Sequence, residues 1–175
     1  MFLVTNDDGD THLLRLLVEC CKKIDNNTLC IMPDRQKSAT GKAMTFHKPM
    51  RLRRIENRIY TLNGNPADCV ALGLHPKLLG VKELEQASPE IIVAGVNTGL
   101  NISMQSFLTS GTIGACIEAT IHGKKSIAFS LEYSQRKHSN KTLELCICGL
   151  SHQAIYNVCL QGLFRVEHEP RSFLF

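Results

Sequence analysis

Short apolar runs recur along the chain, each with the length of a buried strand. These runs cover residues 2–5, 28–32, 90–94 and 126–131. Each contains Val, Ile, Leu or Met and ends near polar or turn residues, which is typical of parallel strands covered on both faces. Residues 44–62 also predict β-structure, with a break at Pro49 and a turn at Glu56-Asn57.

Segments with helical periodicity lie between these runs. Apolar residues recur at helical spacing over residues 12–24 and predict an amphipathic helix. The Asn-Pro pair that begins at Asn65 predicts the start of a second helix, which should run to about residue 79 with a disturbance at Pro76. Two more helices are expected, one capped by Ser110 and one over residues 140–160.

The alternation of strands and helices predicts the fold class. It is typical of an α/β fold with a mainly parallel sheet and helices on both faces. The 175 residues suffice for one well-buried domain, and no linker, internal repeat or low-complexity segment divides them. We therefore expect residues 1–175 to form a single α/β domain.

Composition and charge exclude several classes of protein. No apolar stretch approaches the ~20 residues that cross a bilayer, and the N-terminus lacks a secretory pattern, so we expect a cytoplasmic protein with no membrane partner. The net charge is only +4, and the basic residues 48–58 resemble a solvated strand face, which argues against a nucleic-acid partner. The eight cysteines include no C-x-x-C pair, which argues against a zinc ribbon.

Polar side chains with metal-binding chemistry follow three of the predicted strands. Asp7 and Asp8 come directly after the first strand, Ser38 lies in the loop after the second, and Asn97 follows residues 90–94. The carboxyl ends of parallel strands share one edge of a sheet, so we expect these residues to lie together. Two carboxylates, a hydroxyl and an amide oxygen suit a hard cation such as Mg²⁺ or Mn²⁺. A solvated turn is the alternative interpretation of the Asp pair.

The helix expected to begin at Ser110 adds a site for an anion. Helix N-termini present unpaired backbone N–H groups and the positive end of the helix dipole, which suit a phosphate. A hard cation facing such a terminus is the arrangement expected for phosphoester hydrolysis. Two other nucleotide-binding motifs are absent: Gln36 and Ala43 break the Walker pattern around Gly41-Lys42, and no G-x-G-x-x-G opens a helix.

Five motifs occur in the order and approximate spacing of one protein family. They are TNDDG, PDRQKSATG, NGNPADCV, AGVNTGLN and SGTIGACIEA. On these motifs the chain resembles the SurE (survival protein E) family over roughly residues 1–135, and its LNISMQSFLTSGT segment is most similar to archaeal members. The resemblance implies a Rossmann-like α/β core, a divalent metal, and hydrolysis of nucleoside 5′- and often 3′-monophosphates to nucleoside and phosphate.

Carried over to this chain, the resemblance implies specific residue roles. The metal ligands would be Asp7, Asp8, Ser38 and Asn97. The phosphate region would include Asn6, Asn101, Ser110, Gly111 and Thr112. The catalytic residues would be Asp7 and Asp8. Either metal-activated water or one of these carboxylates could attack the phosphorus, and the sequence leaves both mechanisms open.

The chain departs from the family pattern in three places. The segment after TNDDG lacks the usual Pro-Gly, so that Asp10 and His12 border the site, and we interpret His12 as a solvent-facing residue. Asn65 replaces a Thr, and both residues cap helices well. The chain ends at Phe175, before the family's usual end, so we expect the C-terminal part of the family fold to be missing. The family's homo-oligomer is correspondingly less expected here.

Two alternatives to a nucleotidase stay open. A degenerate SurE-like protein could bind metal or nucleotide with weak or no catalysis: the short C-terminus favours it, whereas the intact set of predicted metal ligands argues against it. An unrelated phosphatase with an aspartyl-phosphate intermediate is the other alternative. Its two carboxylates are usually one residue apart in the loop, whereas Asp7 and Asp8 are adjacent.

Overall fold

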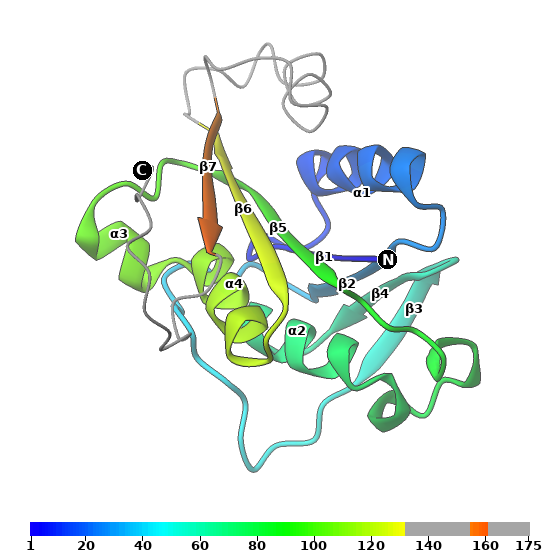
Figure 1. The fold of residues 1–175 in the computed structure, drawn as a ribbon. Helices are drawn as coiled ribbons and strands as arrows, with labels where there is room; N and C mark the ends of the chain where they lie inside the picture. The colour runs from blue at the N-terminus through cyan, green and yellow to red at the C-terminus, as the bar shows by residue number, and fades with distance from the viewer. Residues whose placement is uncertain (132–154, 161–175) are drawn as a thin grey trace, which may run out of the picture.

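A computed structural model describes residues 1–131 and 155–160 of the chain. In these residues seven strands form one sheet, in the order β3-β4-β2-β1-β5-β6-β7 (Figure 1). The parallel strands are β1 (Phe2–Thr5), β2 (Leu29–Pro33), β4 (Ile59–Leu62), β5 (Ile91–Thr98) and β6 (Lys125–Leu131). The edge strands, which run antiparallel to their neighbours, are β3 (Leu52–Glu56) and β7 (Ile155–Leu160). The predicted mainly parallel sheet is therefore confirmed.

Helices cover both faces of the sheet, as predicted. α1 (His12–Ile24) lies on one face, and α2 (Pro66–Leu74) and α4 (Gly111–Ile121) lie on the other (Figure 1). Successive side chains of a strand point to opposite faces. Leu3 accordingly packs in the cluster that contains residues of α2 and α4, whereas its neighbour Val4 packs with α1. The central strand β1 is thus covered on both sides, which explains its continuous apolar sequence.

The helix expected over residues 140–160 is wrong for its last part. Residues 155–160 form β7, which pairs with residues 126–131 of β6. The β-branched and aromatic residues of this segment favour a strand, and the pairing satisfies backbone groups of β6 that would otherwise lie at the sheet edge. The rest of that expected helix, residues 140–154, lies outside the described residues.

The second helix is shorter than expected. α2 ends at Leu74, and a 3₁₀ helix, η1 (Pro76–Leu79), follows it. The residue before a proline is disfavoured in the α conformation, so the α-helix stops before His75, which is its C-cap. The predicted start is confirmed, because Asn65 is the N-cap and its N–H donates to Asp68 Oδ2 at 2.7 Å.

Two strand boundaries also differ from the expectations. Residues 44–51 contain no strand, and the turn of the β3–β4 hairpin is at Asn57 and Arg58. β5 extends to Thr98, so Asn97 lies within the strand instead of after it. Asn97 is therefore the next-to-last residue of β5, close to the edge of the sheet where the parallel strands end.

The remaining helices are short and were not expected from the sequence. They are α3 (Met104–Thr109), which precedes α4, and a 3₁₀ helix, η2 (Lys82–Leu84). Such short segments span too few turns to show helical periodicity. Across residues 1–131 and 155–160, none of the helices combines the length and the apolar character that a bilayer crossing needs.

The packing of α1 predicts different effects for two leucine-sized side chains of that helix. Leu17 is fully buried, whereas Ile24 is 62 % exposed. Leu17→Ala should lower the free energy of unfolding by about 2–5 kcal/mol, because it removes buried methyl groups and leaves a cavity. The matched Ile24→Ala should change it by about 0.5 kcal/mol or less. Urea unfolding measures both values, and equal losses would contradict the described packing.

Candidate functional site

The turn after β1 holds Asp7 and Asp8 in a defined conformation. The buried Asn6 side chain closes this turn: its Nδ2 donates to the Gly9 carbonyl at 2.8 Å, and its Oδ1 accepts from the Gly9 N–H at 3.2 Å. Gly9 has a φ of +77°, a conformation that favours glycine. Asn6 was predicted to belong to the phosphate region, and its amide here stabilises the turn that carries the Asp pair.

Asp7 is buried, with only 3 % of its surface exposed. Its Oδ1 accepts a hydrogen bond from Thr112 Oγ1 at 2.7 Å, and its carbonyl accepts one from the Lys37 N–H at 2.6 Å. Burial raises the pKa of the Asp7 carboxyl above its ordinary value, the Thr112 hydrogen bond lowers it, and the charge of Asp8 raises it. A positive charge bound nearby would therefore favour the ionised form of Asp7.

Asp8 is joined to the loop that follows β2. Gln36 Nε2 donates to Asp8 Oδ1 at 3.2 Å and to Ser38 Oγ at 3.0 Å. The Gln36 side-chain amide thus links two predicted metal ligands, Asp8 and Ser38. Sequence reasoning did not identify Gln36, and the available signal was its place inside the PDRQKSATG motif, two residues before Ser38.

The first turn of α4 packs directly against Asp7. Ser110 is the N-cap, as predicted, and its hydroxyl accepts from the Ile113 N–H at 3.2 Å. Gly111 lies so close that a Cβ there would be 2.7 Å from the Asp7 Cβ. Thr112 is fully buried beside the same carboxylate. Two residues of the predicted phosphate region, Gly111 and Thr112, are therefore next to a predicted metal ligand.

Asn97 lies near the carboxyl end of β5 and Asn101 follows that strand, but their side-chain amides do not bond to the Asp pair. β1 and β5 are parallel neighbours, so their carboxyl ends meet at one edge of the sheet. Asn97 Nδ2 donates to the Gly99 carbonyl at 2.7 Å, and Asn101 Nδ2 donates to Ser130 Oγ at 2.9 Å. In the described residues no hydrogen bond joins either asparagine to the Asp pair. The structure therefore links the amides of Asn97 and Asn101 to Gly99 and Ser130, and not by hydrogen bonds to the Asp pair in the described residues.

The loop between β2 and β3 crosses the start of α4. The Gly41 N–H donates to the Thr109 carbonyl at 2.7 Å. Gly114 allows the crossing, because a Cβ at this position would collide with the Gly41 carbonyl oxygen. Further along the loop, the Thr45 N–H and hydroxyl donate to the two carboxylate oxygens of Asp68, at 2.9 and 2.7 Å. Contacts with α2, α3 and α4 therefore hold the loop in place.

The charge around the Asp pair fits a divalent cation. In the described residues no Lys or Arg forms an ion pair with Asp7 or Asp8. Those residues also contain no group of three or more His, Cys, Asp or Glu placed to hold a metal. A cation here would therefore be bound by carboxylate, hydroxyl and amide oxygens, a set that suits Mg²⁺ or Mn²⁺.

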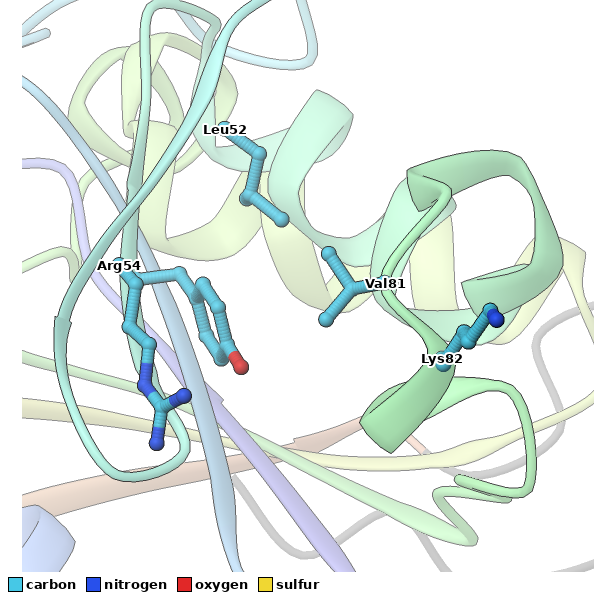
Figure 2. Close-up of a pocket in the computed structure, with 5 residues that line it drawn as sticks. Leu52, Arg54, Val81 and Lys82 are labelled. Carbon is cyan, nitrogen blue, oxygen red and sulfur yellow. The ribbon is translucent and has the colours of Figure 1, made fainter.

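A pocket of about 300 Å³ lies elsewhere, between the β3–β4 hairpin and the segment that follows η1. Figure 2 shows its lining side chains, which are Leu52, Arg54, Tyr60, Val81 and Lys82. None of the predicted metal or phosphate residues lines this pocket. It is therefore separate from the candidate site.

The hydrogen bond between Thr112 and Asp7 predicts a difference between two substitutions. Thr112→Val removes the donor at nearly constant volume and leaves a buried carboxylate oxygen without its partner. It should lower the free energy of unfolding by about 1.5–3 kcal/mol, the range for hydrogen bonds to charged groups. Thr112→Ser keeps the hydroxyl and loses one methyl, which is worth about 0.8 kcal/mol. Urea unfolding in EDTA measures both, and equal stability of the two variants would argue that this hydrogen bond contributes nothing.

Comparison with known proteins identifies the family of this chain. The family model described as Survival protein SurE matches residues 2–168. The chain is 40 % identical over 179 residues to the 5′-nucleotidase SurE of Gloeobacter violaceus, which covers 98 % of this chain and 61 % of that protein. It is 43 % identical over 130 residues to the 5′-nucleotidase SurE of Geotalea uraniireducens, which covers 74 % of this chain and 49 % of that protein.

A solved structure has the same fold. The crystal structure of the SurE protein from Aquifex aeolicus matches with a TM-score of 0.64 and 30 % identity, over 86 % of this chain and 61 % of that chain. The chain spans about half the length of most of the curated relatives it matches. Because the family model covers nearly all of the sequence, we conclude that this chain belongs to the Survival protein SurE family.

Proposed function

We propose that this chain is a metal-dependent phosphomonoesterase that hydrolyses nucleoside 5′-monophosphates, and also 3′-monophosphates, to nucleoside and phosphate. One observation carries the proposal: the buried Asp7 carboxylate, beside Asp8, accepts a hydrogen bond from Thr112 in the first turn of α4. This hydrogen bond joins Asp7, one member of the carboxylate pair, to the N-terminal turn of α4. The substrate class is supported by membership of the family and by the name 5′-nucleotidase that its relatives carry.

The cofactor in this proposal is one Mg²⁺ or Mn²⁺ ion. Asp7, Asp8, Ser38 and Asn97 would hold it. The uncompensated negative charge of the Asp pair and the oxygen-rich donor set support this assignment. When bound, such an ion polarises a phosphoryl oxygen and lowers the pKa of coordinated water.

Different residues of the chain would bind the phosphate and carry out the chemistry. The first turn of α4, from Ser110 to Thr112, would border the phosphate oxygens. The Ser110 N–H already donates to the Ser106 carbonyl at 3.0 Å, so the donors would be the backbone N–H groups that follow Ser110 and have no partner within the helix. Asn6 and Asn101 would border the same region. The Asp7 and Asp8 carboxylates would either activate the attacking water or attack the phosphorus directly. A phosphoryl-enzyme trapped on either Asp would identify the direct attack.

The central test is phosphate release from a panel of 5′- and 3′-nucleotides, with Mg²⁺, Mn²⁺ or EDTA. We expect release by the full chain with metal, none in EDTA, and a loss of about 100-fold or more in Asp7→Asn, because the carboxylate takes part in the chemistry. The matched control is Asp25→Asn. Asp25 pairs with the N-terminus of Met1 at 3.1 Å, near the opposite edge of the sheet, so this variant should keep its activity.

Two results would contradict the proposal. Equal losses in Asp7→Asn and Asp25→Asn would show that the Asp pair has no special role. A folded chain that releases no phosphate, while Mn²⁺ still raises its melting temperature, would be a metal-binding protein without catalysis.

A further inference from the structure

A half-buried lysine pairs with a buried glutamate of α4, outside the residues that the proposed function uses. Glu118 is buried in the last turns of the helix. Lys42 Nζ, from the loop between β2 and β3, lies 2.6 Å from Glu118 Oε2. His122 Nε2 lies 3.0 Å from the other carboxylate oxygen, and the His122 ring meets the ring of His75 edge to face. The two oxygens of Glu118 thus contact partners from two different segments.

Lys42 belongs to the part of the loop that crosses α4. The residue before it, Gly41, donates its N–H to the Thr109 carbonyl, and its own carbonyl oxygen contacts Gly114. Backbone contacts thus hold the crossing near the start of the helix. The long Lys42 side chain adds an anchor further along the same helix, at Glu118.

The same loop is also anchored to the candidate site itself. The Lys37 N–H donates to the Asp7 carbonyl at 2.6 Å, and Thr40 Oγ1 donates to the Lys37 carbonyl at 2.8 Å. Ser38, a predicted metal ligand, lies between the anchor at Lys37 and the anchor at Lys42. The position of Ser38 therefore depends on how both ends of this short segment are held.

An ion pair with a buried member stabilises a fold only weakly, because desolvation of the charges offsets most of their attraction. It does require one geometry, since the buried Glu118 carboxylate is destabilising when Lys42, which is half-buried, moves away. We propose that Lys42 and Glu118 are positioning residues, which hold the loop so that Ser38 and Gln36 face the Asp pair. This inference rests on the proposed function and extends it to two residues beyond the site.

The decisive variant removes both charges together. In Lys42→Met/Glu118→Gln no unpaired charge is buried, and the new amide can still bond His122, so the melting temperature should stay close to that of the parent. The loop has nevertheless lost an anchor. We expect the Lys37 and Gly41 amides to exchange hydrogen roughly tenfold faster, with unchanged exchange in β1 and β5. We also expect roughly tenfold lower kcat/KM and a higher Mn²⁺ requirement.

Two controls separate positioning from general stabilisation. Lys42→Arg keeps the pair and should keep parent values for amide exchange and kcat/KM. Lys124→Met breaks the exposed pair with Glu90, which lies at 2.8 Å, and should also leave both values unchanged. If the double variant does not fold, Lys42→Met alone should show the same faster exchange at Lys37 and Gly41.

The outcomes distinguish this inference from the proposed function. A folded double variant with parent-like exchange at Lys37 and Gly41 and parent-like kcat/KM would overturn the inference, because the pair would then be structural only. A parent that releases no phosphate would overturn the proposed function. In that case amide exchange, together with the shift in melting temperature caused by Mn²⁺, would still decide whether the pair positions the loop.

Discussion

The close approach of α4 to the end of β1 is the constraint on which the site depends. Gly111 has no Cβ, and any larger side chain would meet the Asp7 Cβ and the ring of Pro66 at the start of α2. This spacing allows Thr112 to reach the Asp7 carboxylate with its hydroxyl. A strand end and two helix starts therefore meet at one glycine, and the other polar residues are arranged around that meeting point.

The same packing also affects the charge of the Asp pair. Close packing buries the Asp7 carboxylate, which raises its pKa. The hydrogen-bond donors to Asp7 and Asp8 in the described residues are neutral side chains, Thr112 and Gln36, and not a Lys or Arg. Neutral donors satisfy oxygen lone pairs without cancelling charge. The cationic side chain of Lys42 on the same loop pairs instead with Glu118, away from the Asp pair. In the described residues the Asp pair at the strand end thus forms no ion pair with a Lys or Arg side chain.

The parts of the fold that local patterns control were predicted well. The buried strands, the start of α2 and the Ser110 cap follow from neighbouring residues alone, and so does the placement of Asp7 at a strand end. The parts that were missed depend on partners distant in sequence. β7 is a strand because it pairs with β6, and the roles of Gln36 and Lys42 appear only when the loop lies across α4. Sequence spacing carries no information about such crossings.

The shared hydrogen bond between Thr112 and Asp7 has a thermodynamic consequence. A cation would contact the carboxylate and an anion would contact the helix turn, yet each ligand acts on one end of the same short contact. The two binding equilibria would therefore be linked. If bound phosphate changed the affinity for the metal by some factor, bound metal would change the affinity for phosphate by the same factor. A substitution that altered this coupling would then change the retention of product phosphate and the retention of the ion together.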